Sequence, residues 1–486
     1  MADILELVLV TAVAAYYVIW FLKRANEWYF CSNKKNLPPG DMGWPVLGNM
    51  IPFLKAFKSA NPAPFHDDLI KRYGKTGIYK SHLFGSPIII VSQADLSKAI
   101  LTDDKNFGLS YPNMKELLGK RSISNLDGDE HKRLRRLTTA PINGVKALSG
   151  YIELIEQVFM ASLDEMASMN KPVELFSELK LAGFKVATNI FFGPQGYSVL
   201  EPLTKLFGYI TTACLARKIN IPGFPYYKAL KARHKMVEIV DATIEDRKVK
   251  IKNMESHEEK KCMLDLLLEL ESEDGEKMDN ETMIDLLSVL VFGGHESTAV
   301  ITMWLMIHLH DNPEILQKVK EEQEYIIAKR PPTQQGLTMS EIKEMVYTAK
   351  VIQEVLRLST LGVGAFRYSK ADVEMNGYTI PKGWKILVMY KVVQMDPENF
   401  PNPKSFDPSR WDDHNKNLKA GTYTPFGLGS RICPGNELAK TKLIVFLHCF
   451  LPHYKLERIN PKCRVVSFPN PRPTDNYLVK ITKLPK

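Results

Sequence analysis

The sequence predicts a mainly helical fold with small β-sheets, an α+β arrangement. Four segments, residues 151–166, 229–250, 263–271 and 281–310, repeat apolar residues at the i, i+3, i+4 spacing of an amphipathic helix. One short apolar run, Ile88–Val91, lies between turn residues and predicts a buried strand. Because the helical segments are long and the strand signals are few, we expect a helical body that carries small sheets.

Three further segments complete this outline. Residues 436–450 are largely apolar and follow a Pro-Gly pair, which predicts a helix. Residues 386–393 are apolar, are flanked by prolines that mark turns, and predict a second strand. Residues 255–261 are mostly charged and predict a connection on the surface.

Composition and charge limit the class of protein. The chain has 486 residues, of which 45% are hydrophobic and 24% charged, which is typical of a globular protein with a sizeable core. Its length fits several domains or one large enzyme domain. The net charge of +9 suits an acidic protein partner or an anionic membrane, and dispersed basic residues argue against nucleic acid. The six cysteines form no C-x-x-C pair, which indicates reduced intracellular thiols.

The N-terminus predicts a membrane anchor. Ile4–Leu22 is apolar apart from one glutamate and one threonine, is just long enough to span a bilayer, and is followed by Lys23-Arg24. Positive residues on this side keep the body in the cytoplasm, and the lack of a basic region ahead of the apolar stretch argues against a cleaved signal peptide. We expect residues 1–22 to be a single-pass anchor, residues 23–48 a basic linker with a Pro-rich hinge, and residues 49–486 the body.

A glycine-rich loop near the C-terminus organises the chemistry. Residues 425–435 read Pro-Phe-Gly-Leu-Gly-Ser-Arg-Ile-Cys-Pro-Gly, and Cys433 lies just before the predicted helix. Backbone N–H groups in such a loop and at a helix N-terminus favour thiolate over thiol, so Cys433 is the candidate metal ligand. The loop resembles the haem-binding signature of the cytochromes P-450, Phe-x-x-Gly-x-Arg-x-Cys-x-Gly, at every fixed position.

This resemblance implies a cytochrome P-450 fold, in which residues 49–486 form a haem-thiolate catalytic domain that binds haem b. Cys433 would be the axial ligand of the haem iron, a bond that favours O–O cleavage in this family. By the same signature, Phe426, Arg431 and Gly435 would lie against the cofactor.

One predicted helix contains a second group of chemical residues. Residues 293–294 are both glycine, which a helix interior tolerates where something large must approach its backbone. Glu296 and Ser297 match the acid–alcohol pair with which the family delivers protons, and the adjacent Thr298 is an alternative to Ser297. A zinc-protease motif would need a second histidine where this chain has Ala299.

Glu354 and Arg357 predict a buried ion pair. They lie three residues apart on one helix face, and their apolar neighbours favour burial, which requires a third partner. The resemblance supplies Arg410, within Phe406–Trp411, as that partner. We expect this triad to hold the segment that leads to Cys433, a structural and cofactor-retaining role.

Haem carries two propionates, which require cationic partners. The resemblance assigns this role to His131, Arg135, Arg367 and Arg431, with histidine at 131 where the family more often has tryptophan. Further cations on the cysteine side form either a basic face for an acidic electron donor or scattered surface charge: Lys132, Arg133, Arg136, Lys440 and Lys442.

The substrate pocket is expected to be mostly apolar, which suits a lipophilic polycyclic substrate. Small residues between 361 and 365 leave space above the haem and favour a bulky triterpenoid. By resemblance the pocket draws on Leu109, Tyr111, Met114, Leu117, Leu118, Leu215, Ile219, Ile221, Val289, Phe292, Leu361, Val363 and Phe366.

Several stretches, including Leu37–Gly48 and residues 379–384, resemble a plant group that contains ent-kaurenoic acid oxidase and β-amyrin 11-oxidase. The resemblance implies a membrane-bound monooxygenase that oxidises a terpenoid, such as a β-amyrin-type triterpenoid, with O₂ and electrons from NADPH through a cytochrome P-450 reductase. The alternatives are an ent-kaurenoic acid oxidase of gibberellin synthesis and an electron-independent haem-thiolate isomerase or dehydratase. We expect a monomer in the endoplasmic reticulum membrane, with no nucleic acid partner.

Overall fold

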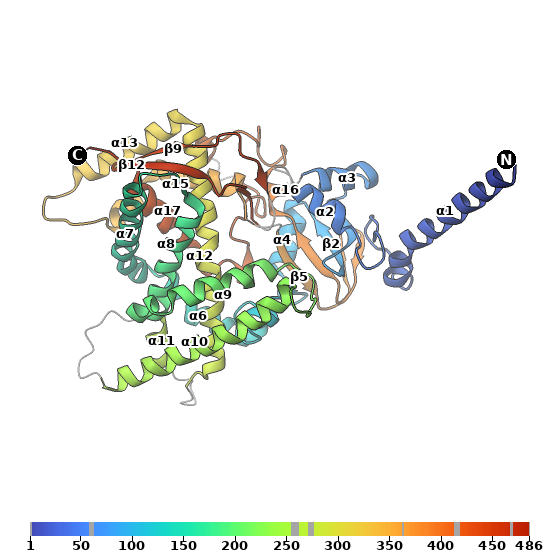
Figure 1. Ribbon diagram of the computed structural model, residues 1–486, viewed down its shortest axis with the longest axis horizontal. Coiled ribbons are helices and arrows are strands. Elements are labelled where there is room, and N and C mark those ends of the chain that lie inside the picture. The colour runs from blue at the N-terminus through green and yellow to red at the C-terminus, as the bar shows by residue number, and fades with distance from the viewer. Residues whose placement is uncertain are drawn as a thin grey trace.

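The computed structural model shows a large helical body, a smaller β-rich part nearer the N-terminus, and a helix, α1 (Ala2–Cys31), that projects away from both (Figure 1). The fold is mainly helical with small sheets, as the sequence predicts. The structure describes residues 2–57, 63–253, 262–270, 277–361, 364–412, 418–466 and 470–485.

Helix α12 (Asn280–Asp311) runs through the centre of the body (Figure 1). It begins where the Asp279 side chain accepts a hydrogen bond from the Thr282 N–H at 3.0 Å, which satisfies a donor that the helix itself leaves free. Most of its residues are buried, because other helices pack around it, among them α8 (Leu175–Phe192), α10 (Pro225–Asn253), α15 (Val346–Leu358) and α17 (Asn436–Phe450).

The helical periodicity predicted α10, α11 (Met263–Glu269) and α12 to within a few residues of their ends, whereas α7 (Val145–Ser168) begins six residues before its predicted start; α17 has the predicted bounds. The predicted surface connection at 255–261 lies outside the described residues. The remaining helices are α2 (Met50–Phe57), α3 (Ala63–Tyr73), α4 (Ala94–Thr102), α5 (Met114–Leu118), α6 (Gly128–Asn143), α9 (Leu200–Ala213), α13 (Pro313–Lys329), α14 (Met339–Glu344) and α16 (Tyr390–Gln394).

A five-stranded sheet organises the β-rich part, in the order β1-β2-β8-β5-β3. Its neighbours are antiparallel except β2 and β8, which are parallel. The strand predicted at Ile88–Val91 is confirmed, and its four side chains are fully buried. The strands of this sheet are β1 (Ile78–Leu83), β2 (Ser86–Val91), β3 (Phe107–Leu109), β5 (Ala365–Ser369) and β8 (Lys385–Val388).

Three smaller sheets lie elsewhere in the described chain. A three-stranded sheet has the order β4-β12-β9, and the other two are two-stranded. Their strands are β4 (Val173–Glu174), β9 (Tyr454–Arg458), β12 (Leu478–Lys483), β6 (Val373–Met375), β7 (Tyr378–Ile380), β10 (Val465–Val466) and β11 (Arg472–Pro473).

The second predicted strand is only half right. β8 ends at Val388, and the next residues form the short helix α16. The chain turns there because Gln394 is buried between two distant segments: its amide donates to the Arg357 carbonyl at 3.0 Å, and its side-chain oxygen accepts from the Thr424 N–H at 3.1 Å. An apolar run does not by itself distinguish a strand from a buried helical turn.

Helix α1 continues through the predicted boundary between anchor and linker at residue 22. The side chains from Leu9 to Leu22 are exposed, while those of residues 1–5, 7, 8 and 23 lie outside the described set. Near its other end, the Asn26 amide donates to the Met42 carbonyl at 3.1 Å, which fixes the helix to the body. In the described part of the chain, the helix long and apolar enough to cross a membrane is the buried core helix α12.

Candidate active site

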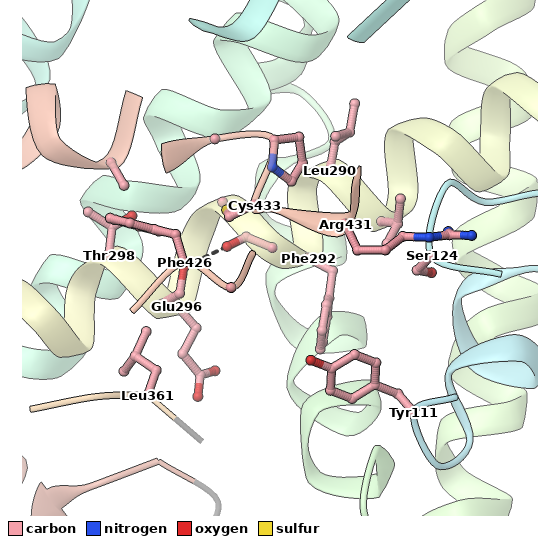
Figure 2. Close-up of a pocket in the computed structure, with 18 of the residues that line it drawn as sticks. Tyr111, Ser124, Leu290, Phe292, Glu296, Thr298, Leu361, Phe426, Arg431 and Cys433 are labelled. Atoms are coloured by element: carbon pink, nitrogen blue, oxygen red, sulfur yellow. Dashed lines mark hydrogen bonds between the residues drawn. The ribbon is translucent and has the colours of Figure 1, made fainter. Parts of the chain in front are cut away.

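The Cys433 loop joins a short 3₁₀ turn, Gly429–Arg431, to helix α17. The Cys433 N–H donates to the Phe426 carbonyl at 2.9 Å, so the loop closes on itself. Gly429 has a φ of +75°, and a Cβ there would collide with the Leu101 carbonyl oxygen, so this position requires glycine. The loop places Cys433 in the wall of a cavity (Figure 2).

Two opposing influences act on the Cys433 thiol. Burial raises its pKa, whereas the N–H of Gly435 and the positive charge of Arg135 lower it. A bound metal ion would supply the further positive charge that makes the buried thiolate the stable form. Among the described residues, no three His, Cys, Asp or Glu side chains gather as metal ligands, so such a metal would need ligands from a cofactor.

The cavity beside Cys433 has a volume of about 560 Å³. Of the residues predicted to contact substrate, Leu117 and Leu118 are instead buried in the core and Ile219 and Ile221 do not line the cavity, while Val363 lies outside the described residues. Those that do line the cavity are Leu109, Tyr111, Met114, Leu215, Val289, Phe292, Leu361 and Phe366.

The residues predicted to bind acidic groups line the same cavity. His131 and Arg135 lie on α6, Arg367 lies on β5, and Arg431 lies in the cysteine loop. Burial, followed by the charges of Arg431 and Arg135, lowers the pKa of His131 to about 4, so the imidazole is neutral at physiological pH. The positive charges of this cluster are therefore its three guanidinium groups.

These positive charges exceed the negative ones around them. Arg431 pairs with Asp127 at 2.6 Å, whereas Arg367 donates to the Phe366 carbonyl at 3.1 Å. Within the described residues, neither Arg135 nor Arg367 reaches a carboxylate at ion-pair distance. Arg135 is half-buried; burial lowers its pKa, and the charge of Cys433 opposes that shift. A buried excess of guanidinium groups is suited to an anionic ligand.

Helix α12 brings its glycine pair and its polar residues to the cavity. Apart from the helix itself, no atom lies within 4 Å of the position that a Cβ of Gly293 would occupy, so a large group has room to approach. Ser297 Oγ donates to the Gly293 carbonyl at 2.6 Å. Thr298 is buried and lines the cavity together with Glu296 (Figure 2). Ser297 lines the cavity as well.

Glu296 is held by two residues from distant segments. Lys180 Nζ of α8 lies 2.8 Å from Glu296 Oε2, and the Asn470 amide donates to Oε1 at 3.2 Å. Burial alone would raise the pKa of Glu296, but the Lys180 ammonium outweighs it and lowers the pKa below its ordinary value. The Lys180 side chain is 25% exposed, so this ion pair connects the cavity to solvent.

The structure brings Glu354, Arg357 and Arg410 into one buried network. Arg357 donates to the two carboxylate oxygens of Glu354 at 2.9 and 2.7 Å, and Arg410 Nε donates at 3.3 Å. Trp411 Nε1 and the Asp407 N–H complete the carboxylate's partners at 3.0 and 3.2 Å. The network ties α15 to the segment that precedes the cysteine loop.

The prediction of a basic face is wrong for one of its members, Lys442. Lys442 is 2% exposed, lines the cavity, and donates from Nζ to the Gly294 carbonyl at 3.2 Å. Burial lowers its pKa to about 8. Sequence reasoning placed it on the surface because charge patterning treats lysines as solvated, but Lys442 lies on the inner side of α17.

Sequence reasoning also missed partners of the site residues. Asp127, which holds Arg431, lies one residue before α6, so its position next to the predicted cationic helix was the available signal. Lys180 and Asn470 come from segments that carry no motif, and only the fold brings them to Glu296.

Comparisons with known proteins agree on one family. The sequence profile described as Cytochrome P450 matches residues 38–481. The chain is 46% identical over 488 residues to 7,8-epoxymelianol synthase of Ailanthus altissima, which covers 99% of this chain and 98% of that protein. It is 44% identical over 470 residues to β-amyrin 11-oxidase of Glycyrrhiza uralensis, and 46% identical over 470 residues to ent-kaurenoic acid oxidase 2 of Arabidopsis thaliana, each alignment covering 96% of this chain and 95% of the relative.

A solved structure agrees as well. Cyanobacterial CYP120A1 with retinoic acid bound matches with a TM-score of 0.81 and 26% identity, covering 92% of this chain and 100% of that chain. The predicted resemblance to the cytochromes P-450 and to their plant group is thereby confirmed.

The cavity fits the cofactor of these proteins. Haem brings its own four nitrogen ligands, so the protein needs to supply only the axial thiolate, which Cys433 offers. The two propionates carry negative charge, and the guanidinium groups of Arg135 and Arg367 lack a carboxylate among the described residues. Gly293 leaves the room that a flat macrocycle needs beside α12. The chain belongs to the cytochrome P450 family and is a monooxygenase with thiolate-ligated haem iron.

Proposed function

We propose that this protein is a membrane-bound terpenoid oxidase whose substrate is a polycyclic triterpenoid of the β-amyrin type. The observation that carries the proposal is the mostly apolar lining, outside the cationic cluster, of the cavity of about 560 Å³ that would hold haem and substrate together beside Cys433. A cavity of this kind suits a large lipophilic molecule. Relatives named for melianol and β-amyrin chemistry support a triterpenoid.

Each part of the cavity has a role in this proposal. Cys433 holds the iron, and bound haem activates dioxygen for insertion of one oxygen atom into the substrate. Phe426 and Gly435 line the cavity around the cysteine. The propionates are held by His131, Arg135, Arg367 and Arg431.

Protons reach the cavity along α12. Lys180 keeps Glu296 ionised at neutral pH, so its Oε atoms accept a proton from water and pass it inward. Ser297 Oγ donates to the Gly293 carbonyl and relays the proton by rotating its hydroxyl, with Thr298 as the adjacent alternative. The Glu354–Arg357–Arg410 network does no chemistry; it fixes the segment ahead of Cys433.

Electrons come from NADPH through a separate reductase in this proposal. Lys132, Arg133 and Arg136 are exposed on α6, the helix that also carries Arg135 of the haem site. A basic face at this place would attract an acidic electron donor.

Helix α1 anchors the protein in the endoplasmic reticulum membrane. Its apolar side chains from Leu9 to Leu22 are exposed, and the helix points away from the body (Figure 1). Deletion of residues 2–22 is expected to release the protein from microsomes washed with sodium carbonate. Retention of the truncated protein in the membrane pellet would contradict a single-pass anchor.

The first experiment is expression in microsomes with a plant reductase. The reduced carbon monoxide complex is expected to show the thiolate type of Soret band, and Cys433→Ser to lose it. Oxidation of β-amyrin that requires NADPH supports the proposal. Oxidation of ent-kaurenoic acid instead would favour the diterpenoid alternative, and turnover without NADPH would favour an isomerase or dehydratase.

A further inference from the structure

The charges around the cavity divide it into two unlike parts. The side chains of the cavity wall that are charged at neutral pH lie on α6, on β5, on the cysteine loop and on the two helices α12 and α17. No charged side chain of the described chain lines the remaining wall. The five charged lining residues are Arg135, Glu296, Arg367, Arg431 and Lys442.

Each of these charges already has a partner or a cofactor to serve. The three arginines fit the haem propionates, as argued above. Lys442 donates to the Gly294 carbonyl at 3.2 Å. Glu296 pairs with Lys180, which itself does not line the cavity. None of these four cations lies on the remaining wall of the cavity.

The wall formed by α9, the first half of α12 and residues 109–114 is uncharged. Phe207 of α9 packs against Phe292 of α12, with ring centroids 6.3 Å apart, so these two helices face each other here. Thr211, one turn further along α9, and Cys214, the residue after the helix, line the cavity. The undescribed residues that adjoin the lining in sequence, 362–363 and 467–469, contain no ionisable side chain.

A negative charge acts at one end of this wall. Burial, followed by the negative charge of Glu296, raises the pKa of Cys214, the residue after α9, to about 12. A substrate carboxylate here would be buried without a cation and close to a like charge. Both conditions disfavour the ionised form.

From this distribution of charge we infer that the substrate is uncharged, a terpenoid alcohol, ketone or hydrocarbon rather than a carboxylate. This inference rests on the proposed terpenoid oxidase and narrows it. A carboxylic acid such as ent-kaurenoic acid enters only in its protonated form.

The test is a titration of the haem-loaded, full-length protein in microsomes, in which the haem absorbance reports binding. β-Amyrin is expected to bind with the same Kd at pH 6 and pH 8. ent-Kaurenoic acid is expected to bind about 10-fold more weakly for each pH unit in this range, because its neutral fraction falls by that factor. A Kd for the acid that is equal at pH 6 and pH 8 would overturn the inference.

A pair of variants tests directly whether the lack of a cation on this wall weakens the binding of the ionised acid. Thr211→Arg adds a guanidinium to the uncharged wall and is expected to tighten acid binding at pH 8 by about 10-fold. Thr212→Arg is the matched control, because Thr212 is exposed and donates to the Gly208 carbonyl of its own helix at 2.9 Å; it is expected to change nothing. An equal gain in both variants would contradict a role for the wall.

These outcomes separate the inference from the proposed function. The carbon monoxide spectrum shows whether each variant folds and holds haem, and the wild-type pH series does not depend on the variants. If neither terpenoid changes the haem absorbance while the carbon monoxide band is normal, the terpenoid assignment fails, and the inference fails with it. If the acid binds as a carboxylate, only the inference fails.

Discussion

Two groups of buried arginines differ in how their charges are balanced. Arg357 gives two donors to Glu354 and the others to backbone carbonyls, such as that of Pro403 at 2.8 Å. Arg367 is also buried and Arg135 is half-buried, yet among the described residues neither meets a carboxylate. The comparison teaches that a buried arginine with all its donors matched holds the fold, whereas one without a counterion indicates a site for an anionic ligand.

The largest effect is expected from Glu354→Ala. This change leaves Arg357 and Arg410 buried without their carboxylate, which costs about 3–5 kcal/mol of unfolding free energy. The measurement is a denaturant titration of the detergent-solubilised protein, followed by circular dichroism. Glu437→Ala is the control, because its pair with Lys440 is half exposed and is worth under about 1 kcal/mol. Equal losses in the two variants would break the comparison.

Lys442→Met is expected to stabilise the protein by about 2 kcal/mol at pH 7, because it removes a buried cation that meets a carbonyl and, among the described residues, no carboxylate. Folding lowers the Lys442 pKa from 10.5 to about 8, so the unfolded chain binds a proton that the native state lacks between these values. Wild-type stability therefore rises with pH through this window, and the advantage of the variant shrinks there. Denaturant titrations at pH 7 and pH 10 measure both effects; an advantage that is the same at both pH values would contradict them.

Arg367→Leu tests whether Arg367 binds the cofactor, in contrast to Arg357 and Arg410, which hold the fold. Because Arg367 has no carboxylate partner among the described residues, its loss is not expected to lower the stability of the haem-free protein. Haem should dissociate about 10-fold faster, since a propionate loses a charged hydrogen bond. Transfer of haem to an excess of apomyoglobin measures this rate. A destabilised apoprotein with unchanged haem transfer would place Arg367 with the structural arginines.

The smallest effect concerns the Lys180–Glu296 pair. Lys180→Met removes the charge that lowers the Glu296 pKa, so burial should then raise that pKa. In the wild type the pair adds stability at neutral pH that is lost as pH falls through the lowered pKa. The acidic limb of the pH–rate profile should therefore move to higher pH in the variant. Lys185→Met of the same helix serves as the control, and an unchanged limb would remove Lys180 from the proton path.

The sequence predicts well those elements that are determined by residues close together in the chain. Helix α17 and the buried strand β2 match their predictions because apolar periodicity and flanking turn residues are local. The cysteine loop and the glycine pair could equally be predicted from the sequence, since both are identified by the spacing of residues along the chain. The strand beyond Val388 and the surface position of Lys442 were wrong because burial there depends on distant segments.

The partners of the site residues show the same limit. Asp127 lies more than three hundred positions before Arg431, with which it pairs. Lys180 and Asn470 reach Glu296 from either side of it in sequence, and no local pattern marks them. The uncharged wall could not be predicted from the sequence either, because it depends on where the fold places every charged side chain around the cavity.

The parallel pairing of β2 with β8 has a consequence for how the protein is made. Ile88–Val91 pairs with Lys385–Val388, so the strand emerges from the ribosome about 300 residues ahead of its partner, a delay of about 15–60 s at ordinary rates of synthesis. Through that interval the apolar strand has an open edge, the kind of edge that attracts other strands. Expression should therefore depend on chaperones more strongly than the stability of the finished enzyme suggests, and slower translation should prolong the hazard.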